Sequence, residues 1–296
     1  MNIIDPHIHL FDLTLGDYQW LKPENPPLWQ DKSSIYKNFS ENDLQLKDLN
    51  KTLDITGFVH IEAGFDNQSP WREVQWLESS CKLNFKSVAC VDLTAPKEHF
   101  LKEIENLLNF KSVVGCRHIL DESAVEILQH PNSLMNLKTL SDNQLSFDLQ
   151  MPLSDTQSVE TLTRILKQLP ELIVIINHAG SPPYTLDAHN NSDDEFNLWL
   201  QGLKAFSQFK NCAIKCSGWE MKKRDYHSTW CEAVIDYCIN LFTIDRVMLG
   251  SNFPLCLFSQ NYHDVWQFNS QLAHYNQQQL EQLCSENTKR WYKFQP

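Results

Sequence analysis

The sequence has little glycine, with 8 residues among 296, and none of them forms a GxGxxG or GxxxxGKS/T pattern. Such glycine-rich loops hold the phosphates of dinucleotides and nucleoside triphosphates in their usual folds, so neither kind of site is expected. The nine cysteines are scattered and contain no CxxC pair. The chain begins MNIIDPHIHL, where charge and histidine interrupt any apolar signal region. Scattered cysteines without an export signal predict a cytoplasmic location.

Long apolar runs and positive charge are also scarce. No run approaches the ~18 apolar residues of a membrane-spanning helix, so no span is expected. Lys and Arg number 25 against 37 for Asp and Glu, which gives a formal net charge of −12. Such an acidic protein repels phosphate backbones and anionic lipid surfaces. We therefore expect neither nucleic acid nor membrane as a partner. The oligomeric state is not encoded in these features.

The sequence does contain short apolar runs rich in β-forming residues, separated by segments of helical periodicity. Eight runs predict strands at residues 2–9, 56–63, 86–93, 112–120, 145–151, 172–178, 212–217 and 246–251. Apolar residues three or four positions apart predict helices at 41–53, 71–82, 97–109, 155–169, 195–208 and 229–242. N-cap signals precede two of these helices, at Ser40 with Asp43 and at Ser154–Asp155.

Eight alternations of strand and helix are the sequence form of a (β/α)8 TIM barrel, an α/β fold. The length suits such a barrel, which has about 250 residues before insertions. We favour a single barrel domain over residues 1–296 and keep an open doubly wound sheet as the alternative. Irregular segments follow the first and sixth strands, at 14–39 and 179–192. Loops in these positions build the active-site mouth of a barrel.

Polar side chains follow the apolar bodies of the predicted strands. They are His7, His9, His60, Glu62, Arg117, His118, Asp148, Gln150, Asn177, His178, Lys215, Ser217, Trp219, Ser251 and Asn252. The C-terminal ends of barrel strands meet at one face, which carries the active site in barrel enzymes. The pattern therefore predicts an enzyme that acts on a small molecule.

His7 and His9 are the sharpest local signal. Residues i and i+2 of a strand point to the same side, about 6–7 Å apart along it. Two such imidazoles can share one metal ion, with a third ligand from another strand, and His178 is the natural third. The alternative is that either histidine only caps a loop. If a metal is bound, the nitrogen ligands suit zinc, manganese or a similar divalent ion.

The other candidates have open alternatives. His60 and Glu62 repeat the i, i+2 spacing, and either may contact substrate or orient His7 or His9 from behind. Arg117 either binds a substrate carboxylate with two hydrogen bonds or closes an internal ion pair with Glu62 or Asp148. Trp219 either forms a wall of the substrate pocket or packs a loop.

The ordered motifs IDPHIHLFD, VHIEAG, VGCRHIL, INHAGSP, IKCSG and DRVMLGSNFPL resemble the amidohydrolase-related superfamily, of the amidohydrolase 2 type. Within it they are most similar to the branch of small lactonases, which includes sugar-acid lactonases and 2-pyrone-4,6-dicarboxylate lactonase. The resemblance covers nearly the whole chain. It implies a (β/α)8 barrel, metal or catalytic roles for His7, His9 and His178, and a place near the substrate for Arg117.

One position departs from the family pattern. Asn252 stands where many members carry an aspartate, in GSDWP-like motifs, which binds metal or takes a proton from the attacking water. An amide cannot act as a general base and is a poorer metal ligand. Strand four also lacks a lysine that can be carbamylated, and strand five lacks a histidine, so the resemblance implies at most one metal.

The leading hypothesis is therefore a hydrolase of a small lactone, working with one divalent metal or with none. Asn252 would orient water or the carbonyl, and the proton would pass to His178, Glu62 or Asp148. A second hypothesis is a decarboxylase on the same barrel. A third is a barrel that kept its small-molecule pocket and lost its activity because Asn252 replaced the aspartate.

Overall fold

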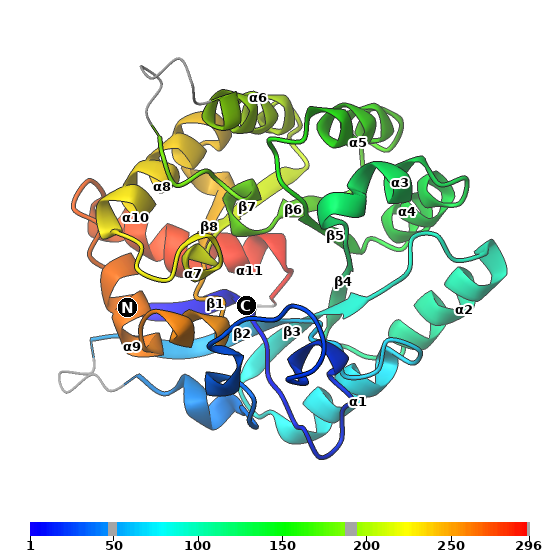
Figure 1. Cartoon of the computed structure of the whole chain (residues 1–296), viewed down its shortest axis with the longest axis horizontal. Coiled ribbons are helices and arrows are strands. Elements are labelled where there is room, and N and C mark those ends of the chain that lie inside the picture. Colours follow the sequence, from blue (N-terminus) through cyan, green and yellow to red (C-terminus); the bar gives the residue numbers. More distant parts are fainter. Residues whose placement is uncertain (47–51, 187–193, 295–296) are drawn as a thin grey trace.

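Eight parallel strands lie side by side in chain order at the centre of the molecule (Figure 1). The structure is a computed structural model that describes residues 1–46, 52–186 and 194–294. All eight predicted strands are confirmed, with small shifts at their ends. They are β1 Asn2–Ile8, β2 Asp54–Ile61, β3 Asn84–Cys90, β4 Val113–Ile119, β5 Ser146–Gln150, β6 Val174–Ile176, β7 Cys212–Cys216 and β8 Val247–Leu249.

The first and last strands close the sheet into a barrel. Ile8 forms a parallel bridge with Phe253, just beyond β8. The N–H of His9 donates to the carbonyl of Phe253 at 2.6 Å, and the N–H of Asn252 donates to the carbonyl of His7 at 3.0 Å. The predicted TIM barrel is thus confirmed, and this closure brings His7, His9 and Asn252 together.

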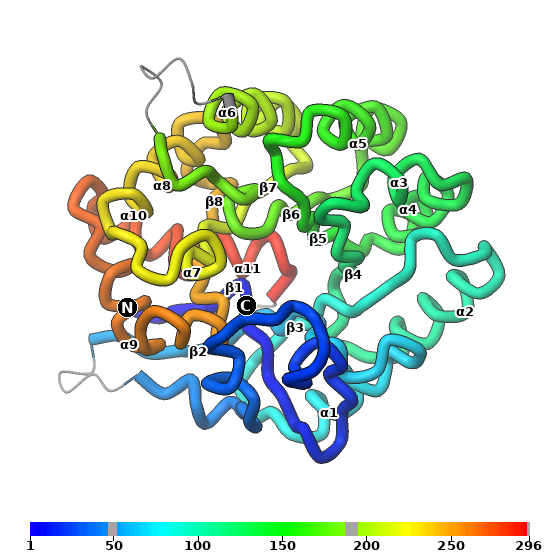
Figure 2. Tube along the Cα trace, in the orientation of Figure 1, coloured from blue at the N-terminus to red at the C-terminus, as the bar shows by residue number. Residues whose placement is uncertain are grey.

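Helices surround the barrel, and the chain runs once around it from blue to red (Figure 2). They are α1 Trp71–Ser80, α2 Lys97–Leu107, α3 Ala124–Gln129, α4 Ser133–Asp142, α5 Thr156–Gln168, α6 Asp194–Ser207, α7 Trp219–Lys222, α8 Ser228–Phe242, α9 Tyr262–Asn269, α10 Gln277–Glu281 and α11 Asn287–Trp291. Five of the six predicted helices are among them. Asp155 caps α5 by accepting from the N–H of Ser158.

The prediction of a helix at 41–53 was wrong over its described part. Only Glu41–Leu44 is helical, as one 3-10 turn that carries the predicted capping box of Ser40 and Asp43. Gln45 is already extended, with ψ of 126°. Residues 47–51 of that prediction lie outside the described residues. Only Leu44 of this turn is buried, so there is no apolar face to hold a longer helix against the barrel.

The interior of the barrel is filled in two layers. An apolar cluster joins Ile4, Val59, Val88, Ile175 and Met248, and the C-terminal residues Tyr292 and Phe294 pack against it. Above this cluster lies a layer of buried polar side chains. The apolar cluster fills the end of the barrel where the strands begin. The open end is the opposite one, where the strands end and where the polar residues predicted from the sequence lie.

The polar layer contains an ion pair that is fully buried. Nζ of Lys215 lies 2.7 Å from Oδ2 of Asp148, and both side chains have no exposed surface. The hydroxyl of Tyr292 donates to the same carboxylate oxygen at 2.7 Å. Burial lowers the pKa of Lys215 to about 8, although Asp148 opposes the shift. This pair joins β5, β7 and the C-terminal segment inside the barrel.

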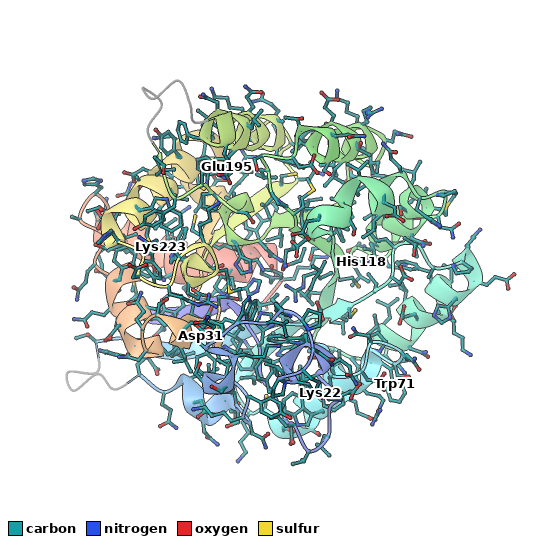
Figure 3. The ribbon with its side chains drawn as sticks, viewed as in Figure 1. Lys22, Asp31, Trp71, His118, Glu195 and Lys223 are labelled. Carbon is teal, nitrogen blue, oxygen red and sulfur yellow. The ribbon has the colours of Figure 1, made fainter. Side chains whose placement is uncertain are left out.

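Two segments cover the open end, which faces the viewer in Figure 1: the segment after β1 and the segment of α7. Arg224 joins them, since its Nε donates to Asp31 at 2.7 Å and its guanidinium lies 5.6 Å from the ring centre of Trp29. Asp31 and Lys223 are labelled on these segments in Figure 3. In the part of the chain that the structure describes, no helix has the length and apolarity to cross a membrane.

Candidate functional site

Three imidazoles from two strand ends meet at the open end of the barrel. Nε2 of His7 lies 3.2 Å from Nε2 of His9, because the i, i+2 spacing in β1 turns both rings to the same side. The ring centres of His7 and His178 are 4.5 Å apart. The structure thus brings together the three residues predicted as the centre of the site.

His9 has its ring orientation set by the backbone. Its Nδ1 lies 2.8 Å from the carbonyl oxygen of Ile61, which can only accept, so Nδ1 carries the proton and Nε2 keeps its lone pair. Burial, and then the charge of Arg117, hold the pKa of His9 well below its usual range. The pKa of His7 is lowered in the same way by burial and by Lys215. Both rings are therefore neutral at physiological pH and able to bind a metal.

His178 owes its place to two local backbone features. It lies just after β6 with φ of 52°, in the left-handed region. The neighbouring Gly218 has φ of +71°, and a Cβ atom there would come within 2.4 Å of Nδ1 of His178. Nδ1 pairs with the hydroxyl of Ser217 at 3.0 Å. Burial and then Lys215 lower the pKa of His178 to about 3, so this ring is also neutral.

The pair of Nε2 atoms suits one tetrahedral metal ion. Ligands at about 2.0–2.1 Å in tetrahedral geometry lie about 3.3 Å apart, close to the 3.2 Å between His7 and His9. The bond from His9 to Ile61 is the outer contact that usually orients a ligating imidazole. Within the described residues, however, no group of three or more His, Cys, Asp or Glu side chains is already arranged around a common centre.

Arg117 is committed to an internal ion pair. Its Nε donates to Oε1 of Glu62 at 2.8 Å, and one terminal nitrogen lies 2.7 Å from the same oxygen. The other terminal nitrogen donates to Oε1 of Gln150 at 2.8 Å. Of the two interpretations left open by the sequence, the geometry favours the internal pair with Glu62. Both residues still line the cavity described below.

His60 lies behind the site instead of in it. Its Nδ1 accepts from the N–H of Leu10 at 3.3 Å, so its Nε2 carries the proton that faces Glu73 at 3.0 Å. His60 does not contribute to the cavity lining. Its candidate role in binding substrate therefore has no geometric support, whereas a role in holding the loop after β1 does.

Asn252 is fixed by a residue that the sequence analysis did not single out. Its Nδ2 donates to Oε1 of Glu220, the second residue of α7, at 2.5 Å. Its Oδ1 is buried and has no hydrogen-bond partner among the described residues. Burial raises the pKa of Glu220 to about 7. A carboxylate thus lies directly behind the amide at 252, in a chain that lacks the aspartate expected there.

A cavity of about 520 Å³ opens above the histidines. Its lining includes the site residues His9, Glu62, Arg117, His178, Trp219 and Asn252. His7 and Asp148 are not part of that lining. His7 lies directly beneath His9 and His178, whereas Asp148 is held lower in the barrel by Lys215 and Tyr292. Asp148 therefore does not face a ligand bound in the cavity.

The comparisons with known proteins agree with the barrel fold. The family model described as "Amidohydrolase", of the amidohydrolase 2 type, matches residues 4–294. The chain belongs to this family. The match confirms the superfamily that the motifs predicted. Its members are hydrolases and decarboxylases, so both kinds of reaction are compatible with it. An uncharacterized protein, y4mH, of Sinorhizobium fredii is 27% identical over 98% of both chains.

Solved structures resemble the fold at low identity. An amidohydrolase from Burkholderia multivorans with bound zinc has a TM-score of 0.79, with 17% identity over all of both chains. A probable 2-pyrone-4,6-dicarboxylic acid hydrolase from Acinetobacter baumannii with bound citric acid has a TM-score of 0.66 and 18% identity, over 99% of this chain and 100% of that one. Such identities support the barrel architecture and leave substrate and metal to be tested.

The Glu220–Asn252 pair has a consequence for stability that depends on pH. The native pKa of Glu220 is raised from 4.5 to about 7, so between these values the native state binds more protons than the unfolded state. The free energy of unfolding should therefore fall as pH rises through this window, by up to about 3 kcal/mol. Glu220→Gln keeps the hydrogen bond to Asn252 but cannot titrate, so its free energy of unfolding should fall less over the same pH range.

Urea unfolding of both proteins at pH 5 and pH 8 measures the difference. Burial raises the pKa of Asp5 to about 6. Asp5 is present in both proteins, so its effect on the free energy of unfolding cancels in the comparison. An equal loss of stability in both proteins would show that Glu220 does not titrate in this window.

Proposed function

We propose that this chain hydrolyses a small lactone at the open end of its barrel. The observation that supports this most directly is the convergence of His7, His9 and His178 with Asn252 beside a cavity of about 520 Å³. These residues lie on β1, after β6 and after β8, the positions from which barrel enzymes draw their active sites. Neutral imidazoles are suited to hold a metal or to accept a proton.

We further propose that Nε2 of His7 and Nε2 of His9 hold one divalent ion, zinc or manganese, and that His178, which the sequence predicted as the third ligand, is left for proton transfer instead. Such an ion polarises a carbonyl and lowers the pKa of a bound water to about 7, which supplies the nucleophile for ester hydrolysis. The protein's part is to keep these rings neutral and oriented. Burial and the contact of His9 with Ile61 do so.

The remaining residues orient the reactants and move the proton. Asn252 offers its free Oδ1 to a water or a hydroxyl, and Glu220 keeps the amide in this orientation. Of the residues considered for proton transfer, His178 and Glu62 line the cavity and Asp148 does not. When Nδ1 of His178 donates to Ser217, its Nε2 is free to accept a proton. We assign proton transfer to His178.

Elemental analysis of the purified, untagged protein tests the metal, and His9→Ala supplies a comparison. We expect about one equivalent of zinc or manganese in the parent and little in the variant. His274→Ala should keep it, because that side chain is 69% exposed and far from the cavity lining. An equal metal content in the His9 variant would contradict the ligand assignment.

The same preparations test the reaction. Opening of a lactone releases one proton, which a pH-stat records, and the product is the hydroxy acid. Release of carbon dioxide from a carboxylated ring would favour the decarboxylase instead. Binding of lactones without any product would favour the small-molecule-binding barrel.

A further inference from the structure

The cavity above the histidines is lined by four tryptophans. Trp20 and Trp29 come from the segment after β1, and Trp219 and Trp230 come from α7 and α8. Each pair is in edge contact, with ring centres 6.2 Å and 5.4 Å apart. Aromatic walls of this kind favour flat, apolar rings, which they contact over a large area.

Two of the four indole N–H groups at these walls donate to backbone carbonyls. Nε1 of Trp20 donates to the carbonyl of Ala63 at 2.7 Å, and Nε1 of Trp230 donates to that of Pro183 at 3.0 Å. Nε1 of Trp219, by contrast, is buried without a partner among the described residues. The indole N–H groups of Trp20 and Trp230 are therefore used within the protein, whereas that of Trp219 is available to a ligand.

The charges at the cavity also count against an anionic ligand. Arg117 uses its hydrogen bonds on Glu62 and Gln150. Lys222 lies at the rim, 34% exposed and 2.9 Å from Glu195, where water screens its charge. Asp121 faces the cavity with no ion pair within 4.0 Å among the described residues, and its contact is the amide of Gln150 at 3.4 Å. A carboxylate on the ligand would therefore be repelled by Asp121. Among the described residues that line the cavity, no unpaired buried cation would offset its charge.

From these walls and charges we propose that the substrate is an uncharged lactone with a flat apolar ring, such as a lactone fused to an aromatic ring. The proposal rests on lactone hydrolysis as proposed above. A metal ion at the histidines would bind the reacting carbonyl, so its charge would not offset the charge of a carboxylate elsewhere on the ligand.

A matched set of compounds tests the proposal. Dihydrocoumarin is the neutral aromatic lactone, carboxy-dihydrocoumarin adds one carboxylate to the aromatic ring, and gluconolactone replaces the aromatic ring with hydroxyls. We expect kcat/KM for dihydrocoumarin to exceed that for the carboxylated compound by about tenfold or more, since Asp121 repels the added carboxylate. We expect a similar margin over gluconolactone, since the four indole rings pack better against an aromatic ring. Faster opening of gluconolactone or of the carboxylated compound would overturn the substrate class and leave lactone hydrolysis standing.

Binding of the corresponding lactams, followed by calorimetry, separates the two proposals. If no lactone is opened but the neutral lactam binds about tenfold more tightly than the carboxylated one, hydrolysis fails and the ligand class stands. If the carboxylated or a polyhydroxylated lactam binds as tightly as the neutral one, the ligand class fails as well.

Two variants identify the groups responsible. Asp121→Asn should tighten binding of the carboxylated lactam several-fold and leave the neutral lactam unchanged. Trp219→Phe keeps an aromatic ring and removes the donor, so it should weaken the neutral lactam. Trp76→Phe is the matched control, because Trp76 of α1 stacks on Phe65 and does not line this cavity. An unchanged preference in the Asp121 variant would contradict the role given to charge.

Discussion

Replacement of His178 by alanine should reduce kcat/KM for lactone opening by about a thousandfold. The ring contacts His7 and lines the cavity, and it is the residue to which we assign proton transfer. Because its pKa is about 3, the ring is already neutral in the folded protein, so its removal strands no buried charge. Steady-state kinetics on the lactone that is opened fastest gives the magnitude.

The circular dichroism spectrum and melting temperature show whether His178→Ala still folds, and His274→Ala serves as the matched histidine control. The exposed His274 is not part of the cavity lining, so its removal should leave kcat/KM unchanged. A His178 variant that folds and keeps full activity would remove this residue from the mechanism.

Replacement of Lys215 by methionine should destabilise the protein by about 3–5 kcal/mol. The change leaves the carboxylate of Asp148 in the barrel interior with the hydroxyl of Tyr292 and without its cation. Burial is the main cause that lowers the pKa of Lys215, which shows how unfavourable a charge is at this depth. Urea unfolding at pH 7 measures the change in free energy.

The double variant Lys215→Met with Asp148→Asn is the control for that prediction. It removes both charges and should recover most of the lost stability, because the cost of the single change comes from the unpaired carboxylate. A single variant as stable as the parent, or a double variant less stable than the single one, would contradict this account of the polar layer.

The strands could be predicted well because each is a short apolar run that the next helix interrupts. The predictions of His7, His9 and His178 at strand ends rested on the same regularity, since the ends of parallel barrel strands meet at one face. Local spacing was sufficient for His7 and His9, which share one side of one strand.

Pairing between distant residues was beyond the sequence. Arg117 was expected either to bind a substrate carboxylate or to pair with Glu62 or Asp148, and only the folded barrel, in which Arg117 of β4 reaches past β3 to Glu62, selects Glu62. Glu220 was missed because nothing in GWEMKK marks it as buried, although a glutamate two residues past a strand-end glycine was a usable signal. The segment 41–53 has apolar residues at helical spacing, but the described turn Glu41–Leu44 buries only Leu44, which is too little to hold a longer helix.

The closure of the barrel has a consequence for how the protein is made. The carbonyl of His7 accepts from the N–H of Asn252, and the N–H of His9 donates to the carbonyl of Phe253. The two halves of the site therefore come from opposite ends of the chain, and the contacts between them are among the most distant in the sequence. A ribosome must release the chain past Phe253 before these bonds can form. A nascent chain consequently carries no assembled site, and any fragment that lacks either end should be inert however well its remaining strands pair.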